Sequence, residues 1–527
     1  QLILSRSIRQ GLDACADILP DVLPDRVRQH HQLCRIEYAY ENIHFPESAE
    51  ALDLARRRLA FEELFLFTIG LERLRSRREV VHVPPCGGVD MELFYRALPF
   101  TLKDAPRRCV EEALADMRSG TPMNRLCQGD VGSGKTMVAA ACVYFMVKNG
   151  RQAALMAPTE ILAQQHYQGL APLLENLGIR CALLTGSTTA KTKRSITQQL
   201  ESGEIDFAIG THALITGSVA YRDLGLVVTD EQHRFGVAQR AELAAKGDHP
   251  HILVMSATPI PRTLALILYG DLDVSIIDQL PPGRQPVQTF AVTGGYHQRV
   301  YRFIRKLVGE GRQAYIVCPM VEENDQLPDE RKAVTEYAKK LQSEVFPDLK
   351  VAFVHGKMKP KEKDAVMAAF AAHETDILVS TTVIEVGVDV PNAAVMVIEN
   401  AERFGLSQLH QLRGRVGRGK HQSYCILISD NRNEETRQRL KVMTKTTDGF
   451  QIAEEDLRLR GPGDFFGARQ HGLPGLKVAD LGCDTQLLQE ARHAAEQLLA
   501  QDPALTSCPA TAERVTELFT QQADALN

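Results

Sequence analysis

The chain has 527 residues, too many for a single hydrophobic core, so its length predicts roughly three to four domains. Its 44% hydrophobic and 24% charged residues are typical of a soluble globular protein, and we expect neither a membrane span nor a secretory signal, because no long apolar run is found. The net charge of −5 gives no overall attraction to nucleic acid, so DNA contacts would need local basic surfaces.

The 11 cysteines are scattered along the chain, and none forms a Cys-x-x-Cys pair. This pattern argues against a zinc or redox motif and favours buried thiols in a reducing compartment. We therefore expect a cytoplasmic protein without a membrane partner.

Residues 1–97 are predicted to be mostly helical. Apolar residues between Leu52 and Leu66 alternate with charged ones, such as Arg56 and Glu63, at the spacing of an amphipathic helix. We favour a helical linker that packs on a neighbouring domain over a binding role for this region.

From residue 98 onward, short apolar runs alternate with helix-sized intervals, which is typical of buried parallel strands in βαβ units. The runs form two series, which we assign to domains 98–283 and 284–447, with the proline-rich 281-PPGRQPV-287 between them as a linker. The first series consists of 153-AALMAP-158, 181-CALLTG-186, 226-LVVTDE-231 and 252-ILVMSAT-258, and the second of 314-AYIVCP-319, 351-VAFVHG-356, 376-DILVST-381 and 394-AVMVIE-399. The fold class is thus α/β, with two parallel sheets in tandem.

The segment 129-GDVGSGKT-136 matches the P-loop pattern G-x-x-x-x-G-K-[ST]. Its glycines let the backbone wrap a phosphate, the N–H groups at the start of the next helix face that phosphate, and Lys135 adds a positive charge. Thr136 is the expected hydroxyl ligand of Mg²⁺, and ATP the expected nucleotide. The predicted nucleotide-binding residues are Gly129, Asp130, Val131, Gly132, Ser133, Gly134, Lys135 and Thr136.

Two adjacent acids, Asp230 and Glu231, follow the apolar run 226–228. A carboxylate at the carboxyl end of a parallel strand faces the crevice in which ligands bind. Asp230 is therefore predicted to hold Mg²⁺ through water, and Glu231 to polarise the attacking water. Such a pair also occurs as a simple turn or cap, but the preceding P-loop favours the catalytic interpretation.

Together with 256-SATPIP-261, these motifs resemble those of superfamily 2 helicases and translocases, and 230-DEQHRFGVAQR-240 resembles RecG in particular. The resemblance implies two RecA-like domains, ATP hydrolysis and 3′–5′ translocation on DNA, with Ser256 and Thr258 linking ATP state to strand movement. The related translocase Mfd usually has Glu where Gln232 stands. One position departs from the family pattern: 98-LPFTLKDAP-106 ends in Pro106 where a glutamine would pair with adenine. We expect weakened selectivity for ATP.

The run 411-QLRGRVGR-418 resembles the helicase motif Q-x-x-G-R-x-G-R, and it makes Gln411, Arg415 and Arg418 catalytic candidates. On a helix, arginines three residues apart share one face, and a guanidinium stabilises a transferring phosphoryl group. The upstream segment 380-STTVIEVGVDVP-391, with Glu385, Gly387 and Asp389, resembles the motif that couples nucleotide state to DNA and makes a merely solvated basic helix a weak alternative.

The resemblance also implies backbone contacts to DNA, which give grip without sequence reading. The implied contact residues are Thr159, Gly186, Ser187, Thr211, His212 and Thr381.

Residues 448–527 form the last region, predicted as a helical hairpin with a C-terminal helical segment. Its part 448-DGFQIAEEDLRLRGPGDFFGARQHG-472 resembles the TRG motif shared by RecG and Mfd, in which a hairpin converts domain closure into a push on duplex DNA. Arg439, Arg460 and Gln470 match the coupling positions of that motif. In RecG a wedge domain of β-strands precedes the helical linker, and we expect it either to lie before residue 1 or to be missing.

The sequence therefore predicts a RecG-type enzyme of the bacterial cytoplasm, associated with the nucleoid. We expect a monomer that acts on branched double-stranded DNA, reversing stalled forks and migrating Holliday junctions, with single-stranded DNA-binding protein as a further candidate partner. Two alternatives stay open: an Mfd-like translocase that acts on a protein obstacle, and a nucleotide-dependent DNA clamp without enzymatic activity.

Overall fold

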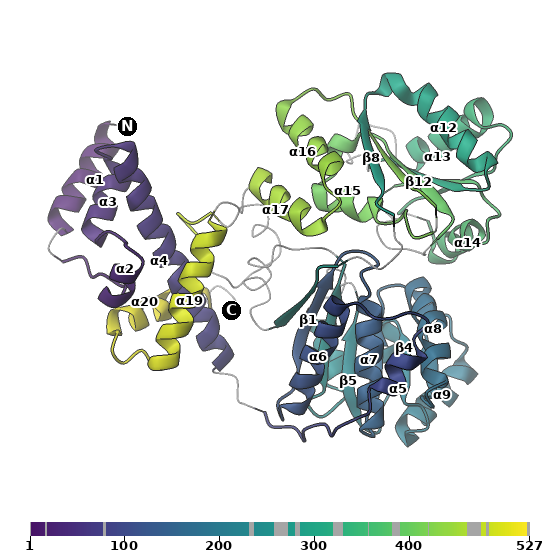
Figure 1. The fold of residues 1–527 in the computed structure, drawn as a ribbon, viewed down its shortest axis with the longest axis horizontal. Helices are drawn as coiled ribbons and strands as arrows, with labels where there is room; N and C mark the ends of the chain where they lie inside the picture. Colours follow the sequence, from purple (N-terminus) through teal and green to yellow (C-terminus); the bar gives the residue numbers. More distant parts are fainter. Residues whose placement is uncertain are drawn as a thin grey trace. The chain divides into compact units, whose positions relative to one another are not determined.

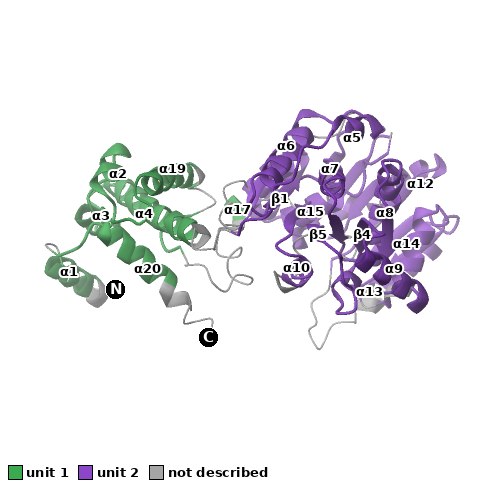
Figure 2. Ribbon diagram, turned by 90° about the horizontal axis from the view of Figure 1, so that it is seen from below, with its two compact units in different colours: residues 1–80, 260–271, 457–527 green, residues 81–259, 272–456 purple. Residues whose placement is uncertain are grey.

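The computed structural model describes residues 2–15, 18–76, 81–230, 237–257, 272–279, 285–319, 330–356, 358–381, 390–419, 421–460, 476–480 and 484–523. The chain divides into two compact units (Figure 2). Unit 1 comprises residues 1–80, 260–271 and 457–527, and unit 2 comprises residues 81–259 and 272–456. The boundary at residue 457 falls within helix α17 (Gly449–Arg460).

Unit 2 contains two parallel sheets, and we call the parts built on them the first and second lobes. The first sheet has seven strands in the order β3-β4-β2-β5-β6-β1-β7. Its strands are β1 (Asn124–Gly129), β2 (Gln152–Met156), β3 (Cys181–Leu184), β4 (Phe207–Gly210), β5 (Leu224–Thr229), β6 (His251–Ser256) and β7 (Asp273–Ile277).

The second sheet has six strands in the order β10-β11-β9-β12-β13-β8. They are β8 (Gln288–Val292), β9 (Gln313–Val317), β10 (Val351–Val354), β11 (Ile377–Ser380), β12 (Ala393–Ile398) and β13 (Tyr424–Ile428). All neighbouring strands in both sheets are parallel. The predicted fold of two parallel sheets in tandem is confirmed.

The strand order of the second sheet repeats that of the first. If β7 is set aside, β8 to β13 occupy the places of β1 to β6 in the same sequence order. The two sheets thus have one connectivity, and positions that follow corresponding strands can be compared between the lobes.

Helices cover the sheets of unit 2 because strands buried on both faces need a second apolar layer on each side. Helix α7 packs on β1, β2 and β5 (Figure 1). Its run of Ala, Val, Cys and Met is buried almost all round. The helices of the first lobe are α5 (Glu92–Ala97), α6 (Asp104–Arg118), α7 (Lys135–Lys148), α8 (Glu160–Glu175), α9 (Ala190–Ser202) and α10 (Val237–Ala244). Those of the second are α12 (His297–Gly309), α13 (Glu330–Lys340), α14 (Pro360–Ala371), α15 (Leu406–Arg413) and α16 (Glu434–Lys445).

Unit 1 is helical and joins the two ends of the described chain. Its helices are α1 (Leu2–Cys15), α2 (Asp25–His30), α3 (Ile36–His44), α4 (Ala49–Ser76), α19 (Thr485–Gln501) and α20 (Pro509–Ala523). The long helix α4 packs against α3, α19 and α20, and buries Phe61, Leu64 and Phe65 completely. The predicted amphipathic helix is therefore present.

Polar contacts fix the same packing. Asp484 accepts two hydrogen bonds from Arg56, at 3.0 and 2.8 Å, and the carboxylate of Glu63 accepts the backbone N–H groups of residues 477–479, each at 2.8 Å. The sequence assigns residues 1–97 and 448–527 to separate regions, whereas helices from both form one unit here. Among the helices described, none is long and apolar enough to cross a bilayer.

Candidate functional site

The P-loop connects β1 to α7, so a helix follows the loop as predicted from the sequence, while the strand before it was not predicted. Gly132 and Gly134 have φ angles of 75° and 105°, a left-handed conformation that glycine adopts without steric cost. A Cβ atom at Gly129 would lie 2.5 Å from Ser133 Oγ, so the loop also needs the absence of a side chain there. Because α7 begins at Lys135, its first N–H groups and helix dipole point into the loop.

The side chain of Lys135 lies inside this loop. Its Nζ donates to the carbonyl oxygens of Gly129 at 2.7 Å and of Asp130 at 2.8 Å. These contacts hold the ammonium group against the backbone that is to surround the phosphates. The loop therefore brings a positive charge and a row of backbone N–H donors together, which is the arrangement that binds the phosphates of a nucleoside triphosphate.

A cavity of about 390 Å³ opens beside the P-loop and is lined from both lobes. The first lobe contributes P-loop residues and residues of α8, together with Asp230 and Ala257, and the second contributes Arg415 and Arg418. The lining comprises Val131, Gly132, Ser133, Gly134, Lys135, Thr136, Met137, Leu162, Gln165, His166, Gln168, Gly169, Leu170, Asp230, Ala257, Arg415 and Arg418. Candidate residues from distant parts of the sequence thus meet at one place.

Asp230 follows directly after β5, and a histidine that the sequence did not single out contacts its carboxylate. His166 Nε2 lies 2.7 Å from Asp230 Oδ2. Thr136 and Asp230 both line the cavity, and a hydroxyl and a carboxylate are the oxygen donors that Mg²⁺ accepts beside phosphates. Among the described residues, no group of three or more His, Cys, Asp or Glu side chains could hold a metal ion without the phosphates of a nucleotide. Glu231 and Thr258 lie outside the described residues.

The expectation that Arg415 and Arg418 share the face of a helix is wrong. Helix α15 ends at Arg413, and Gly417, with φ of 80°, turns the chain between the two arginines. Both side chains nevertheless line the cavity, and Arg418 Nε donates to the carbonyl of Gly414 at 3.1 Å. The turn, rather than helical spacing, brings both guanidinium groups to the P-loop. Gln411 lies on α15 and does not line the cavity.

Family descriptions match three parts of the chain: DEAD/DEAH box helicase over residues 107–267, helicase conserved C-terminal domain over 297–420, and ATP-dependent DNA helicase RecG, domain 3, C-terminal, over 446–518. A Bacillus subtilis protein named ATP-dependent DNA helicase RecG is 49% identical over 95% of this chain and 74% of its own length. The chain belongs to the RecG family.

A Synechocystis RecG is 52% identical over 93% of this chain, which spans 59% of that protein. A solved structure of RecG bound to a three-way DNA junction has a TM-score of 0.71 and 47% identity, and the match covers 89% of this chain and 62% of the other. The chain therefore spans about three fifths to three quarters of the length of these relatives. The two lobes have the predicted RecA-like fold.

Several residues to which the RecG resemblance assigns DNA contacts follow neighbouring strands of the first sheet. Thr159 follows β2, Gly186 and Ser187 follow β3, and Thr211 and His212 follow β4. Parallel strands end at one edge of a sheet, so these residues share that edge. Thr159 caps α8 by accepting from Leu162 N–H at 3.3 Å. This cap does not prevent Thr159 from contacting DNA, because it uses only the hydroxyl oxygen as an acceptor.

Exposure divides the remaining positions of this group. Gly186, Ser187 and His212 are exposed, whereas the side chains of Thr211, Ser256 and Thr381 are buried. The buried side chains cannot contact DNA without a rearrangement. Glu385, Gly387 and Asp389 lie outside the described residues.

Of the proposed coupling residues, Arg439 can be followed in the structure. From α16 its guanidinium donates to the carbonyl oxygens of Glu402 and Phe404, in the segment that leads into α15. Arg439 therefore fastens α16 to the segment before the arginine motif. Arg460 is the last residue of α17, its side chain is not described, and Gln470 lies outside the described residues.

Pro106 lies in the first turn of α6 beside the P-loop. Its ring is buried, and its Cγ would lie 3.7 Å from a Cβ atom at Gly134. The position thus adjoins the P-loop, although Pro106 is not among the residues that line the cavity beside it. A proline ring offers no hydrogen bond to a base.

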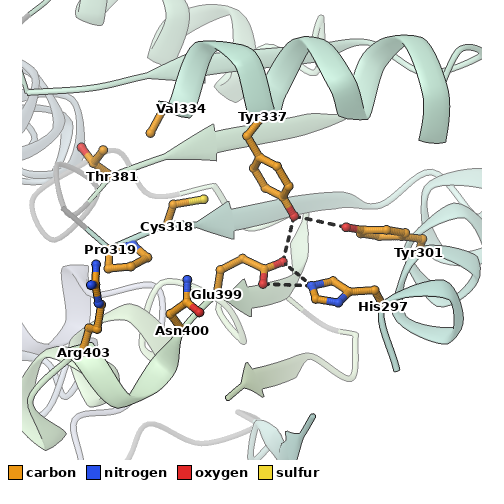
Figure 3. A pocket seen from close by; sticks show the side chains of 10 residues that line it. All are labelled: His297, Tyr301, Cys318, Pro319, Val334, Tyr337, Thr381, Glu399, Asn400 and Arg403. Carbon is orange, nitrogen blue, oxygen red and sulfur yellow. Dashed lines mark hydrogen bonds and ion pairs between the residues drawn. The ribbon is translucent and has the colours of Figure 1, made fainter. Parts of the chain in front are cut away.

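A second cavity of about 400 Å³ lies in the second lobe at the ends of β9, β11 and β12 (Figure 3). At its base the carboxylate of Glu399 contacts His297 Nε2, at 3.0 and 3.1 Å, and accepts from the Tyr337 hydroxyl at 2.8 Å. Burial lowers the pKa of His297, but the Glu399 carboxylate outweighs it and the net pKa is raised. Burial also raises the pKa of Cys318 to about 12. Thr381 lines this cavity and not the first.

Proposed function

We propose that this chain is the ATP-hydrolysing motor of a RecG-type enzyme that translocates on double-stranded DNA, in the 3′–5′ sense, and remodels branched DNA by reversing stalled forks and migrating Holliday junctions. One observation carries the proposal. A P-loop of the first lobe and two arginines of the second line the same cavity, so a nucleotide bound there would touch both lobes. Membership of the RecG family supports the choice of DNA as the track.

In the proposed reaction the P-loop N–H groups and Lys135 hold the phosphates, and Arg415 and Arg418 offset the charge that develops on the transferring phosphoryl group. Glu231 orients the attacking water and accepts its proton. Thr136 and Asp230 would hold Mg²⁺, which when bound neutralises phosphate charge. Loss of the γ-phosphate removes the group that links Lys135 to Arg418, and the contact between the lobes loosens.

Movement on DNA would follow from this alternation. In this proposal Gly186, Ser187 and His212, which are exposed at the strand ends of the first lobe, grip the DNA backbone, and Arg439 and the TRG segment transmit the movement of the second lobe. The solved RecG relative is bound to a three-way DNA junction, which favours branched DNA as the partner here. We further propose a monomer that works near the nucleoid, with single-stranded DNA-binding protein as a candidate partner.

The experiment that tests this function measures ATP turnover without DNA, with single-stranded DNA, with linear duplex and with a model fork. We expect duplex and fork to stimulate turnover more than single strands do. Stimulation by single strands alone would contradict a duplex translocase. An Mfd-like motor that needs a protein obstacle would turn over ATP on linear duplex but leave a protein-free fork unchanged, and a clamp would bind DNA without turnover.

The coupling role of the TRG segment has its own test. Gln470→Ala should leave ATP hydrolysis close to the wild-type rate and slow fork movement, because the residue is proposed to act after hydrolysis. Fork movement is followed by the release of a labelled strand from a model fork. Equal loss of both activities would show that Gln470 acts elsewhere.

A further inference from the structure

The two lobes also meet at the P-loop through residues other than the two arginines. His410 Nε2 of α15 lies 2.7 Å from Asp130 Oδ1, and both side chains are largely buried, with 4% and 17% of their surfaces exposed. One turn later, a Cβ atom at Gly414 would lie 3.0 Å from Val131 Cβ, so the second lobe approaches the loop closely there as well. The contact therefore joins α15 to the second residue of the P-loop.

The hydrogen atoms of this contact can be assigned from its neighbours. Arg413 Nη2 lies 2.9 Å from His410 Nδ1, and a guanidinium has only donors. Nδ1 must therefore accept, which leaves the proton on Nε2, and Nε2–H donates to Asp130. His410 is thus the neutral tautomer, and it links a cation on one side to a carboxylate on the other.

Arg413 continues the chain of contacts to a further element. Its guanidinium is buried, and Nη1 donates to the carbonyl oxygens of Met443 and Thr446, each at 2.9 Å. These carbonyls belong to the last turn of α16 and the residue that follows it, where the helix dipole favours a cation. The segment from residue 446 then leads into α17.

The other end of the chain of contacts lies within the P-loop. Asp130 Oδ1 also accepts from the N–H of Val131 at 2.7 Å, one of the backbone donors of the loop. Burial alone raises the pKa of Asp130, but the hydrogen bond from His410 and the Val131 N–H outweigh it, and the net pKa is lowered. A triphosphate in the loop would bring further negative charge beside this carboxylate and compete for its donors.

We propose that His410 is a positioning residue that connects the P-loop, through Asp130, to the end of α16, through Arg413. The second lobe would then sense an occupied P-loop by a route separate from Arg415 and Arg418, and pass the change toward α17. Hydrogen bonds that end on a charged group at each side favour such a route, because they are shorter and stronger than neutral ones. The proposal rests on the ATP-driven motor proposed above.

A double-mutant cycle on the full chain tests it. His410→Ala should lower DNA-stimulated turnover at saturating ATP about tenfold, within the range of measured coupling between sites, and change the KM for ATP far less. Asp130→Ala should have a similar effect on that rate. If the two side chains act as one link, the double variant is about as slow as either single variant, whereas independent roles would multiply to about a hundredfold. A multiplicative result would overturn the proposal.

A matched pair of substitutions distinguishes loss of the hydrogen-bonded link from loss of folding. His410→Gln keeps a donor near the position of Nε2 and an acceptor for Arg413, whereas His410→Leu has similar bulk and neither. We expect the Gln variant to restore the ratio of DNA-stimulated to DNA-free turnover and the Leu variant to lack it, at similar melting temperatures. Equal ratios in the two variants would contradict the link. A wild-type chain without DNA-stimulated turnover would instead remove the proposed function itself, so the two failures are distinguishable.

Discussion

The two lobes of unit 2 share one strand order, yet their cavities differ in chemistry. In the first lobe Asp230 follows β5 and α7 begins at Lys135. At the corresponding places of the second lobe, Glu399 follows β12 and α12 begins at His297. At corresponding positions of the shared connectivity, each sheet therefore has an acidic and a basic residue at its carboxyl edge.

The difference lies in what these groups contact. Lys135 reaches the carbonyls of a glycine-rich loop, whereas His297 pairs directly with Glu399. In the second lobe the N–H of Gly294, in the short 3-10 helix Gly294–Tyr296 before α12, already donates to the carboxylate of Asp430 at 2.9 Å. An anion of the protein itself thus occupies a donor that a phosphate would need. Topology thus selects the place of a site, while the segment before the helix and its partners decide whether the site binds an anion.

The largest effect on ATP turnover should come from Lys135, the residue whose contacts differ most between the two lobes. Lys135→Ala should abolish ATP turnover, because loss of one group that stabilises phosphate charge typically costs about a hundredfold to a thousandfold and this one also binds the ground state. Steady-state phosphate release on a model fork measures it. The control is His297→Ala at the matching position, which should turn over ATP within about twofold of wild type because a site that does not bind nucleotide adds nothing to transition-state stabilisation. A Lys135 variant that retains turnover would remove the distinction between the lobes.

Arg418 tests whether the second lobe acts on the nucleotide of the first. Arg418→Ala should slow turnover about a thousandfold while ATP still binds, the signature of a group that acts on the transferring phosphoryl group. Single-turnover hydrolysis and the binding of a fluorescent nucleotide separate the two quantities. Arg403→Ala removes an exposed arginine of the second cavity and should leave DNA-free turnover near wild type. Equal losses in both variants would mean that the second lobe acts through its overall charge.

Pro106 tests how the first lobe recognises the base of the nucleotide. We expect the wild-type chain to use GTP almost as well as ATP, since Pro106 beside the P-loop offers the base no hydrogen bond. Pro106→Gln should raise the preference for ATP about tenfold, the value of one good bidentate contact to adenine. Competition between ATP and GTP in steady-state turnover measures the ratio. A strong preference for ATP in the wild type would contradict the expectation and place base recognition at other residues.

The sequence predicted the parts of this fold that rest on local patterns. All eight apolar runs identified as strands are strands, because a strand buried on both faces must be continuously apolar. Strands β4 (FAIG) and β13 (YCILI) have the same pattern but were not predicted, whereas β1 and β8 lack it for physical reasons. Edge strand β8 is mostly exposed, and β1 begins with Asn124 and Arg125, whose guanidinium is balanced by Asp116 of α6 at 2.6 Å.

The same limit applies to the sites. Contiguous motifs located the P-loop, Asp230 and the two arginines, but not the turn that carries the arginines. Side chains that meet only through the fold gave no local signal: His166 beside Asp230, His410 beside Asp130, and Asp484 beside Arg56, more than four hundred positions away. Their residue types are ordinary, and only tertiary packing brings them together.

The smallest expected effect is on thermal stability, and it concerns the pair of His297 and Glu399 in the second cavity. His297 faces Glu399, the Gly294 carbonyl and, farther away, Asp430, and these groups outweigh burial so that its pKa is raised above 6.5. A raised pKa means that the pair stabilises the fold fully below pH 6.5 and that this contribution is lost as pH rises through the folded-state pKa. His297→Gln should therefore lower the melting temperature more at pH 6 than at pH 8. Partial exposure keeps the difference at about 1 kcal/mol or less.

Glu399→Gln is the matched control, because it removes the charge that raises the pKa of His297 while keeping the shape of the side chain. In that background the substitution of His297 should lose its pH dependence. The measurement is thermal unfolding of the four proteins at both pH values. If His297→Gln destabilised the wild type equally at pH 6 and pH 8, the pair would not be ionic, and the second lobe would be closed to anions by its loop and Asp430 alone. The two lobes would then differ in their free backbone donors rather than in charge.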